Sequence, residues 1–250
     1  MIINDTKLNE LFSGKFELVK HEFNDGKFNM DFDFERTQLC AEDKALPMLR
    51  FYGWNPWTVS LGYNQKEDEI DKLKLTEKGF GLVRRPTGGR AVLHADELTY
   101  SVVLTLPKHL SVHDVYREIH IILLKGLKKL AAKGLEFEKV QPDFRQLYDK
   151  QKEMSVSCFA STARYEIALN GKKVVGSAQR LFGNTLLQHG SILLGSGHEQ
   201  LAEITKVQSE EKREILRNYI LNHSATLEEA CDRKISFEEC RNSIISIIEN

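Results

Sequence analysis

The sequence predicts an α+β fold in which helices pack on a largely antiparallel mixed sheet, followed by a helical C-terminal tail. Three observations lead to this prediction. Strand-like segments rich in aromatic and β-branched residues recur from Leu49 onward, one long amphipathic helix interrupts them, and helical patterns dominate after His198. Because no repeat or long linker divides the chain, we expect a main domain over residues 1–195 and a helical extension over residues 196–250, packed on that same domain.

The first half of the chain is expected to form one helix and several strands. The helix covers residues 30–45, where apolar and acidic residues are mixed, and it ends before Pro47. A turn signal, Asn55-Pro56, separates the first two strands. The expected strands are residues 49–54, 57–63, 81–85, 91–94 and 98–106.

The second half begins with the clearest helix of the sequence, residues 111–132. Ser111 is suited to cap its start, apolar residues recur at helical spacing, and Gly134 lies beyond its end. Asn170-Gly171 is a strong hairpin signal, and residues 236–239 resemble a capping box before the last helix. The expected strands here are residues 164–169, 173–178 and 185–194.

The charge balance argues against a polyanionic partner. The chain has 35 Lys and Arg residues against 36 Asp and Glu residues, a formal net charge of -1, so it lacks the basic excess that nucleic acids or anionic membranes attract. No apolar run approaches the ~18 residues that a membrane span needs, and the N-terminal residues do not read as a signal peptide. We expect a soluble, cytoplasmic protein with no nucleic-acid and no membrane partner.

The four cysteines are far apart and form no Cys-x-x-Cys pair, so we expect free thiols and neither a metal site nor a disulfide framework. Cys158 lies in a small polar stretch, residues 155–162, that has the character of a loop. This context makes Cys158 the candidate nucleophile. Cys40, Cys231 and Cys240 fall in expected helices, where a buried, unreactive thiol is the ordinary outcome.

A first motif follows the strand expected at residues 81–85. Two glycines there allow backbone N–H groups to approach a ligand closely, and nearby arginines are suited to neutralise a phosphate or orient a carbonyl. The pattern is not that of a nucleoside-triphosphate P-loop. From the residues alone, a plain hairpin with a solvated basic rim explains it equally well. The candidate substrate-binding residues are Arg84, Arg85, Thr87, Gly88, Gly89, Arg90 and His94.

A second motif follows the Asn170-Gly171 turn. A lysine near a turn, such as Lys173, is commonly a solvated surface group, but beside a thiol its ammonium would lower the thiol pKa and favour the thiolate. The small residues Gly176, Ser177 and Ala178 permit close approach of a ligand and are also compatible with ordinary strand packing. Further along, His189 and Gly190 complete the candidate binding residues, although a purely structural histidine remains an alternative reading.

Together the two motifs resemble the signature of the lipoate-protein ligase and octanoyltransferase superfamily. Arg-Arg-x-Thr-Gly-Gly followed by Ala-Val-x-His spans residues 84–94, and Gly-x-Lys-Val-x-Gly-Ser-Ala-Gln spans residues 171–179. Gln-His-Gly-Ser-Ile-Leu at residues 188–193 completes the pattern. The ATP-dependent ligases usually have a third glycine where this chain has Arg90, and an aspartate where it has Ala95, so the likeness is stronger to the octanoyltransferase branch.

The resemblance implies a biotin/lipoate ligase-like catalytic domain over residues 1–195 and an acyltransferase activity without a cofactor. In the cysteine-dependent octanoyltransferases a Cys-Phe loop precedes the lysine hairpin at a similar distance, which implies Cys158 as nucleophile and Lys173 as the group that supports the thiolate and polarises the acyl carbonyl. The implied donor is octanoyl-acyl carrier protein. The implied acceptor is a lysine of an apo lipoyl domain, in a 2-oxoacid dehydrogenase subunit or the glycine cleavage H protein.

Two alternatives stay open. An ATP-dependent lipoate-protein ligase of the same fold would require ATP and Mg, with Lys173 on the acyl-adenylate and Cys158 incidental. The short tail after Leu194 weighs against it, since many such ligases carry a further domain. A non-catalytic binder of acyl groups or lipoyl domains is the other alternative, and the presence of both Cys158 and Lys173 argues against it.

Overall fold

A six-stranded sheet forms the centre of the computed structural model, which describes residues 2–3, 11, 14–137 and 165–249. All neighbouring strands in this sheet are antiparallel except β2 and β3, which are parallel. The predicted mixed, largely antiparallel sheet is therefore confirmed. In spatial order the strands are β1 (Ile2–Ile3), β2 (Phe16–Asn24), β3 (Met48–Trp54), β7 (Glu97–Thr105), β12 (Thr185–Leu193) and β11 (Val175–Phe182).

Two three-stranded sheets flank the centre. The first has the order β5-β4-β6, where β4 pairs in parallel with β5 and antiparallel with β6. The second has the order β10-β9-β8 and is antiparallel throughout. The strands of these sheets are β4 (Thr58–Leu61), β5 (Gly81–Arg84), β6 (Val92–His94), β8 (Leu135–Phe137), β9 (Ile167–Leu169) and β10 (Lys172–Lys173).

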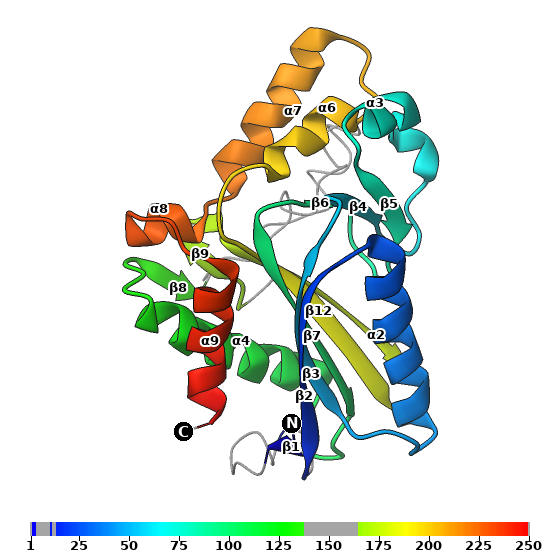
Figure 1. Cartoon of the computed structure of the whole chain (residues 1–250), viewed down its shortest axis with the longest axis vertical. Helices are drawn as coiled ribbons and strands as arrows, with labels where there is room; N and C mark the ends of the chain where they lie inside the picture. The colour runs from blue at the N-terminus through cyan, green and yellow to red at the C-terminus, as the bar shows by residue number, and fades with distance from the viewer. Residues whose placement is uncertain (1, 4–10, 12–13, 138–164, 250) are drawn as a thin grey trace.

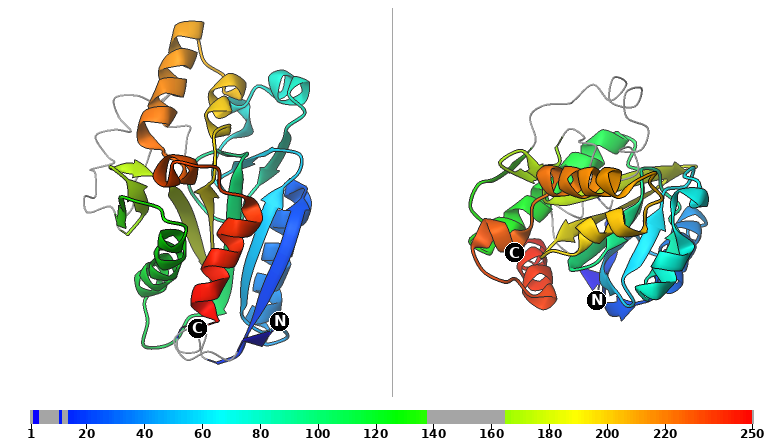
Figure 2. Two further views of the ribbon diagram at one scale, coloured as in Figure 1. Left: turned by 60° about the vertical axis from the view of Figure 1, so that its left-hand side comes forward. Right: turned by 90° about the horizontal axis from the view of Figure 1, so that it is seen from above.

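Helices cover both faces of the central sheet. Helix α2 (Gly26–Ala41) lies on one face, while α4 (Val112–Lys129) and α9 (Phe237–Ile248) lie together on the other (Figure 1). The left-hand view in Figure 2 shows the same arrangement, with the central sheet between α2 and the pair α4 and α9. Helices α3 (Lys72–Glu77), α6 (Leu201–Ile204) and α7 (Glu210–His223) lie beyond the end of the central sheet, near β4 and β5 (Figure 1). Helix α8 (Leu227–Cys231) lies elsewhere, near the start of β8, where the Lys133 N–H donates to the Ala230 carbonyl. Two single helical turns are η1 (Glu67–Glu69) and η4 (His198–Gln200).

The main hydrophobic core lies between the sheet, α4 and α9. Ile119 and Leu127 of α4 and Ile244 of α9 are buried in it, and each such side chain contributes about 1.5–3 kcal/mol relative to exposure. The two helices cross closely because Gly126 has no side chain: a Cβ there would lie 2.7 Å from the Ile244 Cα. The C-terminal helix therefore shares its core with the sheet.

The helix starts follow their caps. The Ser111 hydroxyl accepts from the Asp114 N–H as predicted, and the Asp114 carboxylate accepts from the Ser111 N–H, which completes a capping box. Helix α2 begins at Gly26 and ends at Ala41, so the predicted range of 30–45 was wrong at both ends. The Asp25 side chain accepts from the Phe28 N–H and starts the helix earlier than the apolar pattern suggested.

The region predicted as one strand over residues 173–178 belongs to two sheets. Strand β10 stops at Lys173 in a small sheet, and β11 continues to Phe182 in the central sheet. Val174 is the junction, because its N–H donates to the Ile167 carbonyl in one sheet while its own carbonyl accepts from the Leu193 N–H in the other. Three strands were not predicted, namely the short β8, the edge strand β1 and its neighbour β2. Within the described residues, none of the helices combines the length and the apolar character needed to cross a membrane.

Candidate active site

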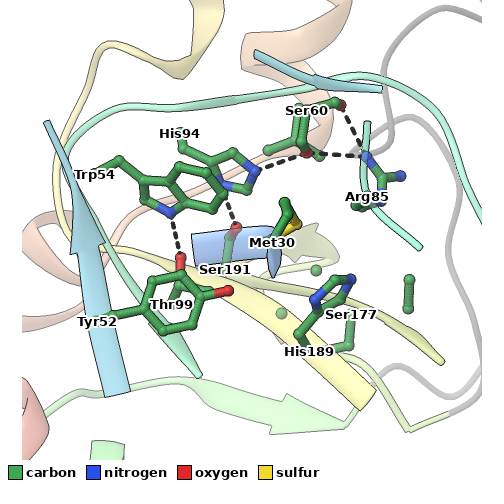
Figure 3. A pocket seen from close by; sticks show the side chains of 14 residues that line it. Met30, Tyr52, Trp54, Ser60, Arg85, His94, Thr99, Ser177, His189 and Ser191 are labelled. Carbon is green, nitrogen blue, oxygen red and sulfur yellow. Dashed lines mark hydrogen bonds between the residues drawn. The ribbon is translucent and has the colours of Figure 1, made fainter. Parts of the chain in front are cut away.

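A pocket of about 360 Å³ lies where the central sheet meets the β5-β4-β6 sheet (Figure 3). Seven predicted site residues line it, two from the first motif and five from the second. They meet because β11 pairs with β12 in a register that places Ser177 opposite Gly190 and Ala178 opposite His189. The lining consists of Met30, Tyr52, Trp54, Ser60, Arg85, Val92, His94, Thr99, Gly176, Ser177, Ala178, His189, Gly190 and Ser191.

One wall of the pocket is a chain of hydroxyl, imidazole and carboxylate groups. The Ser60 Oγ lies 2.7 Å from the His94 Nε2, and the His94 Nδ1 lies 2.8 Å from the Glu97 Oε1. The same carboxylate oxygen accepts from the Ser191 hydroxyl at 2.8 Å and the Thr99 hydroxyl at 2.5 Å. Because a carboxylate only accepts, the His94 Nδ1 carries a hydrogen and the orientation of the ring is fixed.

Aromatic stacking holds His94 from a second direction. Its ring lies 3.9 Å from the Trp54 ring, centroid to centroid, at an interplanar angle of 9°. The Trp54 indole N–H donates to the Thr99 hydroxyl at 2.7 Å. Since Ser60 is fully buried, this wall holds a rigid, oriented imidazole rather than an exposed serine nucleophile.

A second chain of the same type passes through His189. Its Nε2 lies 2.6 Å from the Thr87 hydroxyl, and its Nδ1 lies 3.6 Å from the Asp33 carboxylate. Asp33 also accepts from the Arg50 guanidinium at 2.7 Å and the Tyr52 hydroxyl at 3.1 Å. Burial lowers the pKa of His189, against the opposing effect of Asp33, so its imidazole is neutral at pH 7.

Arg85 supports the glycine-containing loop from within. Its guanidinium donates to the carbonyl oxygens of Gly88 at 2.9 Å and Arg90 at 2.6 Å, and to the Ser60 carbonyl at 2.9 Å. Arg84 points elsewhere and donates to the carbonyls of Gly62 and Gln65. Arg84, Thr87, Gly88, Gly89 and Arg90 are thus next to the lining residues rather than among them.

The loop that contains Gly88 and Gly89 also contacts Gly62, which belongs to neither motif. A Cβ at Gly62 would lie 1.9 Å from the Gly89 carbonyl oxygen, so this contact requires glycine. Gly89 itself has a φ of +94°. The loop and the Gly62 turn are therefore packed backbone against backbone.

Gly62→Ala is expected to lower the free energy of unfolding by about 1–3 kcal/mol, because the new methyl group displaces the backbone of the loop. Urea unfolding measures the change. Gly88→Ala is the matched control for stability, since a Cβ at Gly88 would meet no atom within 4 Å. Equal free energies of unfolding for the two variants would contradict the tight packing at Gly62.

Lys173 is buried beside the pocket rather than in its lining. Its Nζ lies 2.9 Å from the Glu166 Oε2, and both side chains are almost fully enclosed. The surface alternative considered from the sequence is therefore excluded for Lys173. Cys158, the predicted nucleophile, lies outside the described residues.

The other three cysteines lie on helices, as expected. Cys40 and Cys240 are buried and Cys231 is half-buried, all as free thiols. Burial raises the pKa of each thiol, which disfavours the reactive thiolate.

Within the described part of the chain, no cluster of three or more His, Cys, Asp or Glu side chains is arranged to hold a metal ion.

Several lining residues were not predicted as site residues. Ser191 lies two positions after His189, and Thr99 two positions after Glu97, so each pair shares one face of its strand. Polar side chains repeated on one face of a buried strand are a signal available in the sequence. Met30 gave no such signal, because a methionine in a helix is ordinarily a core residue.

The comparisons with known proteins identify the family of the chain. The chain matches the lipoyl protein ligase A/B catalytic domain over residues 25–249. It is 39% identical over 223 residues to the Octanoyltransferase LipM of Anoxybacillus flavithermus, a match that covers 86% of this chain and 78% of that protein. It is 38% identical over 223 residues to the Octanoyltransferase LipM of Kyrpidia tusciae, with coverages of 87% and 80%.

Solved structures show the same fold. A bi-partite lipoate protein ligase from Thermoplasma acidophilum superposes with a TM-score of 0.69 at 22% identity, covering 92% of this chain and 81% of that one. A lipoate-protein ligase A bound with ATP gives a TM-score of 0.67 at 22% identity, with coverages of 92% and 83%. The predicted lipoate ligase-like fold is confirmed, and the chain belongs to the lipoyl protein ligase A/B catalytic domain family.

Proposed function

We propose that the chain transfers an octanoyl group from octanoyl-acyl carrier protein, through a thioester on Cys158, to a lysine of an apo lipoyl domain. The observation that carries this proposal is the meeting of both sequence motifs at one pocket, in a chain whose relatives at 38–39% identity are named octanoyltransferases. The reaction is cytoplasmic in this proposal, where thiols stay reduced.

The pocket suits a short acyl chain. The small residues Gly176, Ala178 and Gly190 line one wall, and Met30 and Val92 add apolar surface. The acyl carbon chain would contact these groups and leave its carbonyl near the polar residues.

The proposed reaction has two balanced steps. In the first, the Cys158 thiolate attacks the donor thioester carbonyl, a new C–S bond forms, the old C–S bond breaks, and the carrier sulfur leaves as a thiolate that takes up the proton Cys158 had released on ionising. In the second, the neutral lysine amine attacks the acyl-enzyme, a C–N bond forms, and the released proton passes to the departing Cys158 sulfur. Exchange between thioesters is nearly isoenergetic and amide formation runs downhill, so neither step needs ATP.

Intact-mass measurement after incubation with octanoyl-acyl carrier protein, with and without ATP, tests the proposal. The expected result is an enzyme heavier by one octanoyl group in the absence of ATP, which returns to its original mass when an apo lipoyl domain is added. Acylation of the lipoyl domain from free octanoate only when ATP and Mg are present would instead identify an ATP-dependent ligase. Binding without any change of mass would identify a non-catalytic binder.

Lys173 is proposed to stabilise the Cys158 thiolate and to polarise the acyl carbonyl. Glu166, 2.9 Å away, pairs with the ammonium and fixes it in place. An ammonium held in a nearly water-free site acts on a neighbouring thiol more strongly than one in solvent.

Lys173→Ala is therefore expected to raise the pKa of Cys158, measured as the pH dependence of its alkylation by iodoacetamide. In the wild type this pKa should lie below the value of about 8.5 for an unperturbed thiol. Lys172→Ala is the control, because the Lys172 Nζ donates to the Leu221 carbonyl on the protein surface. Identical alkylation profiles for the wild type and Lys173→Ala would show that Lys173 does not act on the thiol.

A further inference from the structure

Behind the pocket wall, four polar side chains from four different elements form a buried chain of hydrogen bonds. Ser177 of β11 lies 2.7 Å from the Tyr100 hydroxyl of β7 and 2.9 Å from the His120 Nε2 of α4. The Gln188 amide of β12 donates to the Tyr100 hydroxyl at 2.9 Å. Of these four residues only Ser177 lines the pocket. It is therefore the member of the hydrogen-bond network that can contact a bound molecule.

The contact between His120 and Tyr165 determines which atoms of this network donate their hydrogens. The His120 Nδ1 lies 2.7 Å from the Tyr165 carbonyl oxygen. A carbonyl only accepts, so the Nδ1 carries a hydrogen. Burial lowers the pKa of His120 to about 4, and the charge of Lys173 acts in the same direction. At neutral pH the Nε2 therefore has no hydrogen and accepts.

The hydroxyl of Ser177 consequently points away from the pocket. It donates to the His120 Nε2, because that nitrogen needs a donor and the Tyr100 hydroxyl is farther from it, at 3.3 Å. Tyr100 then donates its hydrogen to the Ser177 Oγ, and burial raises the pKa of Tyr100, so the hydrogen stays on the phenol. A hydroxyl oxygen has two lone pairs, so Ser177, which lines the pocket, has one left to accept a hydrogen bond from a bound molecule.

The hydrogen-bond network is possible because Gly190 has no side chain. A Cβ at Gly190 would lie 2.4 Å from the Ser177 Oγ and 2.7 Å from the Tyr100 Cε1. The conformation that brings these two hydroxyls together therefore requires glycine at this position.

We propose that Ser177 accepts a hydrogen bond from the amine of the acceptor lysine as it attacks the acyl-enzyme, and that His120 is the positioning residue that turns the Ser177 hydroxyl. This inference rests on the proposed function. With its own hydrogen committed to His120, Ser177 has nothing to donate to a thioester carbonyl, but it orients an N–H group. Holding one N–H of the neutral amine aims the nitrogen lone pair at the acyl carbon. The amine proton still passes to the departing Cys158 sulfur.

The test measures the two half-reactions separately by rapid quenching and intact mass. Ser177→Ala is expected to slow transfer from the octanoyl-enzyme to the apo lipoyl domain about tenfold, the effect of one hydrogen bond. Acylation of the enzyme by octanoyl-acyl carrier protein should stay within about twofold. His120→Leu should reproduce this pattern, because Ser177 then loses its acceptor and its hydroxyl is released to turn toward the pocket.

The double variant provides a sharper measurement. If the two residues act as a unit, Ser177→Ala combined with His120→Leu transfers the acyl group no more slowly than the slower single variant. Multiplied effects would overturn the role of His120. Ser101→Ala is the control, a buried strand serine whose hydroxyl has no hydrogen-bond partner among the described residues, and both of its rates should match the wild type.

The outcomes distinguish this inference from the proposed function. If Ser177→Ala slows acylation by the carrier protein as much as transfer, the partner of Ser177 is an N–H group of the donor and the inference is wrong. Unchanged rates for both half-reactions would also overturn it. If the wild type is never acylated, the proposed function itself fails. Should His120→Leu not fold, Ser177→Ala alone still decides the inference.

Discussion

Cys158→Ala is expected to abolish octanoyl transfer, by roughly four orders of magnitude or more, while the fold stays intact. Without the sulfur no thioester forms on the enzyme, so there is no acyl-enzyme for the acceptor lysine to attack. Single-turnover assays with octanoyl-acyl carrier protein and an apo lipoyl domain measure the loss. Circular dichroism verifies the fold.

The other cysteines provide controls for this experiment. Cys231→Ala removes a half-buried thiol on α8 whose pKa is raised by burial, so transfer should continue at the rate of the wild type. Cys40 and Cys240 are buried more deeply, and their replacement should affect stability only. Normal transfer by Cys158→Ala without ATP would end the proposed mechanism.

Asp33→Ala is expected to lower the free energy of unfolding by about 3–5 kcal/mol, because it leaves the charge of Arg50 buried without its carboxylate partner. Both side chains have no exposed surface, and their ion pair is 2.7 Å long. Asn29 continues to accept from Arg50 at 2.6 Å, but an amide does not neutralise a cation. Guanidinium chloride unfolding at pH 7 measures the change.

The same ion pair makes stability depend on pH. Burial alone would raise the pKa of Asp33, but Arg50 and His189 outweigh it and hold this pKa below its ordinary value. A carboxyl with a lowered folded-state pKa stabilises the protein above its unfolded value, about 3.9, and this contribution is lost as the pH falls through the folded-state value. The wild type should therefore lose stability in acid more steeply than Asp33→Ala. Asp31→Ala, on the exposed side of the same helix, should behave as the wild type.

Local signals predicted most of the fold. Ser111, the apolar spacing after it and the turn at Asn170-Gly171 are short-range features, and each led to the correct element. Strand β2 was missed because it is near the edge of the sheet, where polar residues such as Lys20 alternate irregularly with apolar ones. The start of α2 was misplaced because the cap at Asp25 precedes the apolar pattern.

The site was predictable in its residue types but not in its geometry. Motif spacing placed His94 and His189 among the candidates. Glu97 lies only three positions from His94, but nothing local indicates that Asp33 is the carboxylate beside His189. The Asp33 and His189 side chains come from α2 and β12, and only the packing of that helix on the sheet brings them together. The ion pair of Lys173 with Glu166 likewise depends on the pairing of β9 with β10.

The junction at Val174 lies next to the point where the C-terminal extension contacts the backbone of Lys173. Lys173 and Gly176 are three positions apart, yet the first belongs to a small peripheral sheet and the second to the central sheet. The backbone carbonyl of Lys173 accepts from the Ala225 N–H at 2.9 Å, and Lys173 forms a β-bridge with Ser224. The segment between α7 and α8, remote in sequence from both motifs, therefore helps to hold the lysine that we propose to act on Cys158, although it does not line the pocket.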